Sequence, residues 1–216
     1  MRLVPLLVHD TLTLEKPMKL IFALLISLTA LAFVVGCESD SSAQADSSEH
    51  KHDAKSGEKK TAVANVSPSK ASATQPANGQ AKGTIEFHQT GGKVHIAGEI
   101  SGLKPNAKHA IHIHEKGDLS APDLSSAGGH YNPEKHAHGG PTTSKAIHAG
   151  DLGNLQTDDK GVAKMDLTVD NISLGGQKND VLGKAVIIHA KEDDLKSQPS
   201  GAAGDRIGGG VIELKQ

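Results

Sequence analysis

Residues 93–100 read KVHIAGEI, and this stretch decides the fold class because apolar and polar side chains alternate along it. An extended chain places Val94, Ile96 and Ile100 on one face and the polar side chains on the other. The same period of two occurs at residues 84–87, and a Gly-Gly pair between the two stretches favours a hairpin turn. Further strands are expected at residues 61–66, 108–115, 162–169, 185–190 and 210–214. Short strands with one buried face predict an antiparallel sandwich or closed barrel.

The composition narrows the classes of function. The chain has 216 residues, which is room for one domain with appendages. Its 23 Lys and Arg against 25 Asp and Glu give a formal net charge of -2, so no nucleic-acid partner is expected. Aromatic residues make up 2% with no Trp, which argues against a base-stacking platform. The 13 histidines favour a metal site, and the single cysteine, Cys37, excludes an intrachain disulfide.

The first part of the chain resembles a targeting segment. Residues 20–36 form an uncharged apolar run that follows Lys19 and ends directly before Cys37. This order resembles a bacterial lipoprotein signal, so residues 1–36 are expected to be a signal peptide and Cys37 the site of lipid attachment. A transmembrane anchor is the alternative interpretation.

The residues on both sides of this signal complete the predicted domain organisation. Met18 is the expected true start, because residues 1–17 carry acidic side chains upstream of the apolar run. Residues 37–60 lack large apolar side chains and are expected to be the lipidated cysteine and a disordered tether. Residues 61–216 form the expected folded domain. The protein is therefore expected in the cell envelope, anchored to a membrane through Cys37, either at the outer membrane, on the periplasmic side, or exposed at the surface.

Strand parity predicts where several histidines point. His112 and His114 lie on the strand face opposite to Ile111 and Ile113, so they should project outward if the isoleucines fill the core. The same argument applies to His189 on a later strand. Long loops are available to cover this outer wall, and loops on a rigid scaffold often carry function.

A loop segment over residues 130–151 supplies further metal ligands. Its four histidines and one carboxylate are His130, His136, His138, His148 and Asp151. An all-nitrogen set of imidazoles is typical of Cu(II), whereas three histidines with one aspartate suit tetrahedral zinc. Each histidine alone could be hydrogen-bonded or solvent-facing. This many potential ligands in one domain, three of them aligned by strand parity, favour a metal centre.

Ordered motifs in the chain resemble those of the copper,zinc superoxide dismutases. The first has that family's HxHExGD pattern, the next three look like its zinc-loop motifs, and the last three match its final copper ligand, electrostatic loop and C-terminal signature. In chain order they are HIHEKGD at 112–118, AGGHYNP at 127–133, HGGP at 138–141, HAGDLGN at 148–154, VIIH at 186–189, DDL at 193–195 and GDRIGGGVI at 204–212. The resemblance covers residues 61–216.

The resemblance implies an all-β antiparallel Greek-key barrel or sandwich, immunoglobulin-like, with long metal-binding and electrostatic loops. It implies copper held by His112, His114, His130 and His189, and zinc held by His130, His138, His148 and Asp151. His130 would bridge the two ions and take part in catalysis, Asp193 would link copper-side and zinc-side histidines, and Arg206 would stand at the mouth of the copper site. The HGGP context selects His138 over His136, which is then a spare, solvent-facing residue.

The implied activity is that of an oxidoreductase, a superoxide dismutase that converts two superoxide anions into oxygen and hydrogen peroxide. The alternatives are a copper or zinc carrier or buffer on the same scaffold and a lipoprotein that binds only structural zinc. Lys191 and Lys196 could attract the anion or be ordinary surface lysines.

The resemblance also implies a homodimer as one form of assembly and an intrachain disulfide. This chain has Leu124 and Gly209 at the two positions that the disulfide would join. Zinc binding is therefore expected to do more of the ordering of the loop before His130.

Overall fold

The computed structural model describes residues 59–75, 79–142, 146–176 and 178–216. The expected signal peptide at residues 1–36, the lipid-attachment site Cys37 and nearly all of the expected tether lie outside these residues. Within the described part, no helix is long and apolar enough to cross a membrane.

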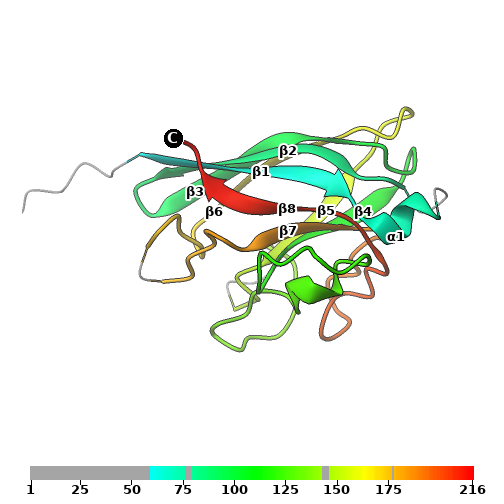
Figure 1. Ribbon diagram of the computed structural model, residues 1–216. Helices are drawn as coiled ribbons and strands as arrows, with labels where there is room; N and C mark the ends of the chain where they lie inside the picture. Colours follow the sequence, from blue (N-terminus) through cyan, green and yellow to red (C-terminus); the bar gives the residue numbers. More distant parts are fainter. Residues whose placement is uncertain (1–58, 76–78, 143–145, 177) are drawn as a thin grey trace, which may run out of the picture. The chain divides into compact units, whose positions relative to one another are not determined.

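Eight strands form one antiparallel sheet in the described part of the chain (Figure 1). They are β1 (Lys60–Pro68), β2 (Lys82–Thr90), β3 (Lys93–Ser101), β4 (Lys108–His114), β5 (Asp151–Gln156), β6 (Ala163–Val169), β7 (Ala185–His189) and β8 (Arg206–Leu214). Their order across the sheet is β5-β4-β7-β8-β1-β2-β3-β6. The end strands β5 and β6 contact each other, which nearly closes the sheet into a barrel. The predicted all-β antiparallel fold is confirmed.

The alternation along β2 and β3 builds the core as predicted. Val94, Ile96 and Ile100 of β3 are fully buried, and so is Phe87 of β2. The two strands form a hairpin whose turn contains Gly91 at a φ of 59°, a left-handed conformation that favours glycine. The opposite faces of both strands remain partly exposed, so each strand covers the core with one side only.

Two strands differ from the sequence-based expectation. β5 was not predicted, because Gly153 at a φ of 83° and Asn154 interrupt the apolar alternation. β8 begins at Arg206 rather than at residue 210, because its glycine run pairs with β7 and β1 without needing apolar side chains. Two single turns, α1 (Lys70–Ala73) and η2 (Ser125–Ala127), lie in the connections.

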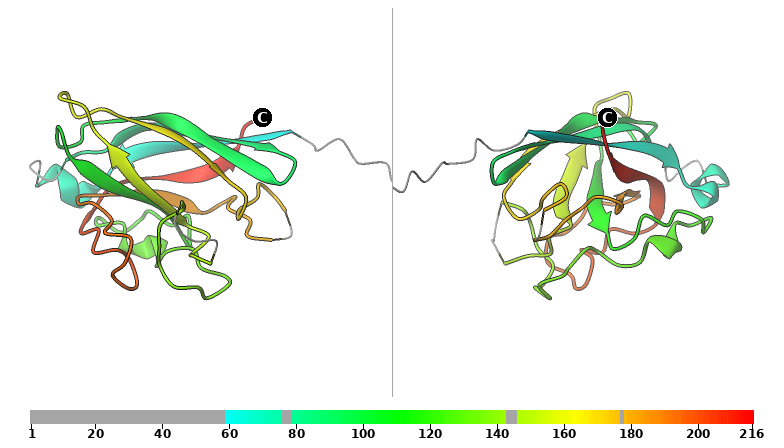
Figure 2. Two further views of the ribbon diagram at one scale, coloured as in Figure 1. Left: turned by 180° about the vertical axis from the view of Figure 1, so that it is seen from behind. Right: turned by 60° about the vertical axis from the view of Figure 1, so that its left-hand side comes forward.

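The long connections gather on one side of the barrel. In Figure 1, β1, β2 and β3 form the upper layer, while the segments between β4 and β5 and between β7 and β8 extend from the opposite side; both views in Figure 2 agree. Gln198 and His138 link the two segments, because the His138 backbone N–H donates to Gln198 Oε1 at 2.8 Å. The loops therefore cover the outer wall made by β4 and β7.

Candidate metal centre

Three histidines project from β4 and β7 away from the core, as parity predicted. These strands pair side by side, with Ile113 opposite Val186. His112, His114 and His189 are nevertheless almost completely buried, because the loops close over them. Imidazoles held this way are excluded from bulk water and fixed by the sheet beneath them.

One ring nitrogen each of His112, His114, His130 and His189 lies within 4.8 Å of the others. The Nε2 atoms of His114 and His189 are 3.4 Å apart. Nδ1 of His114 lies 2.9 Å from the Gly128 carbonyl oxygen, and Nδ1 of His189 lies 3.2 Å from the Gly204 carbonyl oxygen. A carbonyl only accepts, so Nδ1 carries the proton in both rings and Nε2 presents its lone pair inward.

A second set of donors converges on Asp151 at the start of β5. Its Oδ1 atom lies 3.0 Å from Nδ1 of His130, 3.0 Å from Nδ1 of His138 and 3.2 Å from Nδ1 of His148. The group whose donor atoms all lie within 4.8 Å contains His112, His130, His138 and Asp151. His148 is not a member of this group but contacts it through Asp151. His112 belongs to both groups. His130 belongs to both sets, with Nδ1 facing Asp151 and Nε2 without a hydrogen-bond partner.

Asp193 lies between the two sets of histidines and bonds to one ring of each. Its Oδ2 accepts from His112 Nε2 at 2.8 Å, and its Oδ1 accepts from His138 Nε2 at 2.9 Å. Asn154 holds this carboxylate's backbone in place, because its Oδ1 accepts from the Asp193 N–H at 2.8 Å and its Nδ2 donates to the Asp193 carbonyl at 2.9 Å. These bonds orient both imidazoles: His112 Nδ1 has no hydrogen-bond partner, and His138 Nδ1 faces Asp151.

The unpartnered nitrogens test whether metal ions fit this site. Among the buried side-chain atoms of the described residues, four ring nitrogens have no hydrogen-bond partner: His109 Nε2 on the core side, and His112 Nδ1, His130 Nε2 and His148 Nδ1 in this cluster. Leaving a buried polar atom unsatisfied costs about 1–3 kcal/mol, so three in one cluster would be a defect without a further ligand. Four imidazoles suit copper, and three imidazoles with a carboxylate suit zinc. The residues present fit both ions.

Comparison with known proteins agrees with this donor chemistry. The family model described as copper/zinc superoxide dismutase (SODC) matches residues 81–212. The chain belongs to the copper/zinc superoxide dismutase family. The Cu-Zn superoxide dismutase of Paramecium bursaria Chlorella virus 1 is 46% identical over 140 residues, which are 62% of this chain and 73% of that protein. Superoxide dismutase 1 of Aquifex aeolicus (strain VF5) is 43% identical over 139 residues, covering 62% and 82%. The crystal structure of the clock protein EA4 matches with a TM-score of 0.62 and 39% identity over 72% of this chain and 95% of that one.

The pKa values of the buried histidines and of Asp193 favour cation binding at this site. Burial lowers the pKa of His112 to about 4, and it lowers the pKa of His189 well below the ordinary value, so both rings are neutral near pH 7. Burial alone would raise the pKa of the Asp193 carboxyl, but the hydrogen bonds from His112 and His138 outweigh it and hold the pKa well below its usual range. The pKa of His138 is raised to about 9, because its bonds to Asp151 and Asp193 outweigh burial. An ion that binds at His138 must therefore displace a proton.

Arg206 at the start of β8 is tied to the loop that precedes His130. Its Nη1 donates to the Leu124 carbonyl at 2.6 Å and its Nη2 to the Gly128 carbonyl at 2.7 Å. The Gly128 oxygen also accepts from His114 Nδ1, so one carbonyl joins the arginine to the first donor group. Burial lowers the pKa of Arg206 while the Asp123 charge opposes this shift. The guanidinium stays positively charged.

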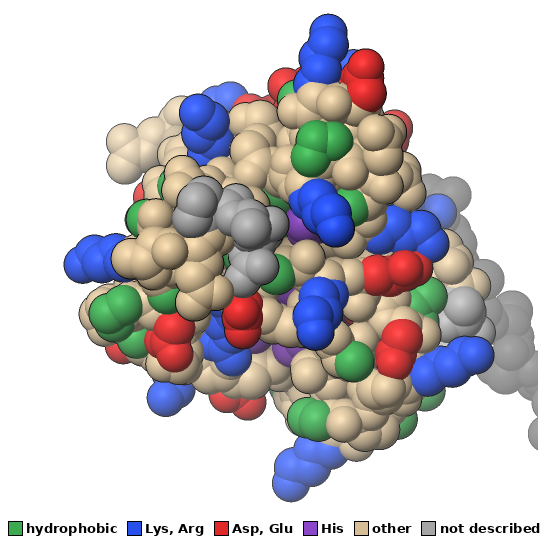
Figure 3. Space-filling view, turned by 90° about the vertical axis from the view of Figure 1, so that its right-hand side faces the viewer, with side chains coloured by type: hydrophobic (Ala, Val, Ile, Leu, Met, Phe, Trp, Pro, Cys, Tyr) green, Lys and Arg blue, Asp and Glu red, His purple; other side chains and the backbone are tan. Residues whose placement is uncertain are grey.

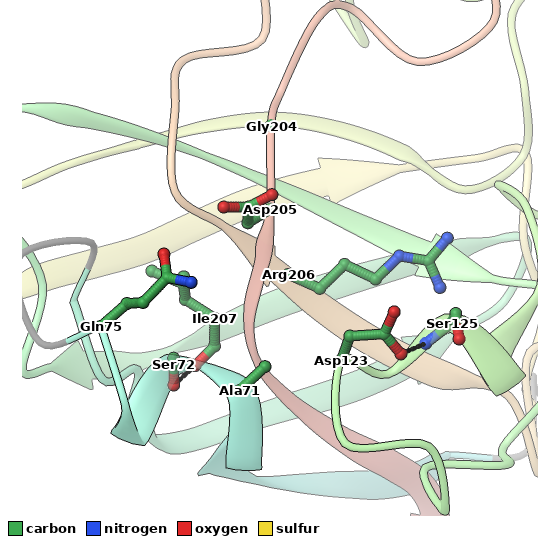
Figure 4. Close-up of a pocket in the computed structure, with 9 residues that line it drawn as sticks. All are labelled: Ala71, Ser72, Gln75, Asp123, Ser125, Gly204, Asp205, Arg206 and Ile207. Carbon is green, nitrogen blue, oxygen red and sulfur yellow. Dashed lines mark hydrogen bonds between the residues drawn. The ribbon is translucent and has the colours of Figure 1, made fainter.

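A cavity of about 380 Å³ adjoins Arg206 between α1 and residues 204–207. In Figure 4 the Arg206 side chain extends away from Gln75, over Asp123 and toward Ser125. The guanidinium therefore lies at one edge of this hollow. Burial is the main cause of the lowered pKa of His114, and the charge of Arg206 adds to it.

Not every candidate from the sequence joins the centre. His136 belongs to neither donor group; its Nδ1 lies 3.1 Å from the Ile147 carbonyl and the side chain is half-buried rather than fully solvent-facing. Lys191 and Lys196 are exposed, and the Lys191 stem packs over Gly204. Figure 3 shows histidine side chains partly covered by Lys or Arg side chains on the face that it presents.

The sequence-based reasoning missed residues that position the ligands. Asn154 had a signal, since it ends the HAGDLGN motif, but its bonds to Asp193 follow only from the fold. His109 faces the core, where its Nδ1 donates to the His189 carbonyl at 2.9 Å. Gln198 accepts from the His138 N–H and donates to the His138 carbonyl at 3.1 Å. Strand parity with Ile111 and Ile113 places His109 on the core face, but no local pattern marks its bond to the His189 carbonyl, and none marks Gln198.

Proposed function

We propose that this protein is a superoxide dismutase that converts two superoxide anions and two protons into oxygen and hydrogen peroxide. The observation that carries the proposal is the position of His130, which belongs to both adjacent donor groups and has Nδ1 at Asp151 and an unpartnered Nε2. We assign copper to His112, His114, His130 and His189, and zinc to His130, His138, His148 and Asp151. When bound, copper supplies one-electron oxidation and reduction of superoxide, while zinc supplies a fixed positive charge beside His130.

The chain's own residues bind the substrate and handle the proton. Arg206 offers a permanent positive charge to a small anion, and its two carbonyl contacts fix the guanidinium next to the first donor group. His130 Nε2 has no partner among the described residues, so it is the ring atom that can take and release a proton. Asp151 engages Nδ1 of the same ring, which leaves Nε2 as the nitrogen available to the first group.

Metal analysis together with turnover tests this proposal. We expect the protein to hold copper and zinc and to dismutate superoxide catalytically. His189→Ala should lose copper and activity and keep zinc, because His189 belongs to the first donor group and not to the second. A protein that binds both metals without turnover would be a carrier or buffer instead. One that takes up zinc and no copper would be a structural zinc protein.

We also propose that the chain is a lipoprotein of the cell envelope. The supporting observation is the uncharged apolar run at residues 20–36 that ends at Cys37, the only cysteine. On this proposal residues 37–60 tether the domain at residues 61–216 to the membrane. Incorporation of labelled fatty acid should be lost in Cys37→Ser, and the protein should then leave the membrane fraction. Retention in the membrane without label would favour a transmembrane anchor.

We further propose that an apolar contact stands where the family's disulfide would lie. A Cβ atom placed on Gly209 would be 3.2 Å from Leu124 Cδ1, so the two positions are neighbours. A single cysteine in the chain excludes the covalent link itself. A homodimer stays a prediction, which sedimentation velocity of the metal-loaded protein tests.

A further inference from the structure

The outer face of the β2–β3 hairpin carries a pair of histidines that the metal centre does not use. His88 and His95 are direct partners in the antiparallel register. Their ring centroids lie 6.3 Å apart with an interplanar angle of 28°. The two side chains are 43% and 44% exposed, whereas the neighbouring Phe87 and Val94 point into the core. The pair therefore faces solvent on the side of the barrel away from the loops that build the metal centre.

A carboxylate accompanies each of these imidazoles. His88 Nε2 lies 3.3 Å from Glu86 Oε2, and His95 Nε2 lies 2.9 Å from Asp166 Oδ1. The register aligns Glu86, Ala97 and Asp166 across three adjacent strands, next to the row that holds the histidines. Ala97 has only a methyl group, so no bulky side chain separates the two carboxylates. Two imidazoles and two carboxylates thus surround one small residue.

These four groups match the donor set of a borderline divalent cation. Imidazole and carboxylate are the ligands that zinc takes at about 2.0–2.2 Å, which puts neighbouring donor atoms about 3.3 Å apart. The two histidine–carboxylate distances are already of this size. Two carboxylates with two neutral imidazoles carry a formal charge that balances a dication. Lys215 Nζ contacts Glu86 Oε1 at 3.1 Å, which leaves Oε2 on the side of His88.

In this structure the donor atoms of the four side chains do not yet converge on one point. Within the described ranges, the groups of three or more donors that already lie within 4.8 Å are those of the metal centre. Directly opposed residues on antiparallel strands have Cβ atoms about 4.5–5.5 Å apart, close enough for both rings to reach one ion. Their exposure leaves the rings room to turn toward each other. A cation would replace the imidazole proton in each histidine–carboxylate contact.

We propose that His88, His95, Glu86 and Asp166 form a second, surface-exposed binding site for a zinc or copper ion. It is separate from the buried centre, and the inference does not depend on dismutase activity. The sheet supplies a rigid base, while the exposed position makes the site readily accessible and its ion exchangeable.

Titration of the full chain with zinc tests the site. The protein is first saturated with copper and zinc at the buried centre, and zinc chloride is then added while calorimetry and the histidine ring signals in NMR are followed. We expect one further zinc ion to bind and to shift the His88 and His95 signals. His88→Ala and His95→Ala should each lose this ion at the zinc concentration that saturates the parent, and Asp166→Asn should weaken it.

Two controls separate this site from other histidines. Thr168→Ala changes an exposed neighbour of His95 in the same row and should leave the additional ion in place. His50→Ala/His52→Ala removes the two histidines of the expected tether and should leave the additional ion in place as well. The proposal is overturned if no further ion binds, if the ion survives His88→Ala/His95→Ala, or if it disappears with the tether histidines.

Discussion

The side chain of Leu124 packs against Gly209, where an added Cβ atom would lie 3.2 Å from Leu124 Cδ1. Ile187 and Leu119 border the same spot, so the contact belongs to a small apolar cluster beside β8. The Leu124 carbonyl meanwhile accepts from Arg206 Nη1 at 2.6 Å. Packing and hydrogen bonds thus hold the loop against the strand without a covalent bond.

Cysteines at positions 124 and 209 should form a disulfide across this contact. In a Cys37→Ser background, Leu124→Cys/Gly209→Cys would close a loop of about 85 residues, worth at most about 4–5 kcal/mol in the chain-entropy model. We expect a higher Tm for the oxidised variant than for the same variant in reductant, measured by calorimetry. Each single cysteine variant is the control, and no difference between oxidised and reduced protein would contradict the predicted neighbourhood.

Arg206 is predicted to act on the substrate and not on metal retention. Arg206→Ala should keep copper and zinc but lower kcat/KM by about tenfold or more at low salt, with a weaker dependence on ionic strength. Arg206→Lys should recover part of the loss, because it keeps the charge but cannot donate to both carbonyls as a fork. Stopped-flow dismutation at several salt concentrations measures this. Lys164→Ala, exposed on β6, is the matched charge control; an equal effect there would show that only net charge matters.

Asp193 is predicted to control which nitrogen of two histidines binds metal. Asp193→Asn keeps the shape but places an amide donor against His112 Nε2 or His138 Nε2, which moves that ring's proton to Nδ1. Metal affinity should fall about 10–100-fold, as for other groups that orient ligands. Competition with a chelator measures the change. Glu192→Gln removes the neighbouring exposed charge, which pairs only with Lys108 among the contacts described, and should leave affinity unaltered.

The period of two explains how much of this architecture the sequence could predict. It placed Val94 and Ile96 in the core and turned His112, His114 and His189 outward, because strand parity is a local property. It missed β5, where Gly153 breaks the alternation and Asp151 is both a strand residue and a member of the second donor group.

Contacts between distant segments have no such local signal. The bonds from Gln198 to His138 and from Asn154 to Asp193 join residues far apart in the chain, and neither pair follows from spacing. The surroundings of Gly201 could not be predicted from the local sequence either. Its backbone lies so close to Asp193 and His138 that a side chain would collide with both, which only the folded arrangement reveals.

Gly201 therefore provides a sharp test of the carboxylate link between the two donor groups. Its φ of 65° is left-handed, and a Cβ there would overlap Asp193 Oδ1 and lie 2.7 Å from His138 Nε2. Gly201→Ala must push the carboxylate away or shift the loop that Gly201 closes through its N–H bond to the Ser197 carbonyl at 2.7 Å. We expect zinc affinity to fall about 10–100-fold, because His138 loses the partner that fixes its orientation.

Gly183→Ala is the matched control for that substitution. Gly183 has a similar φ of 72°, but a Cβ there would meet no atom within 4 Å. Gly183→Ala should lower the free energy of unfolding by about 1–2 kcal/mol, because alanine must adopt the left-handed conformation there. Zinc affinity should stay unchanged. Thermal unfolding of the metal-free variants and chelator competition of the loaded ones separate the two effects. If both alanine variants bound zinc equally well, the contact between Gly201 and Asp193 would have no part in orienting His138.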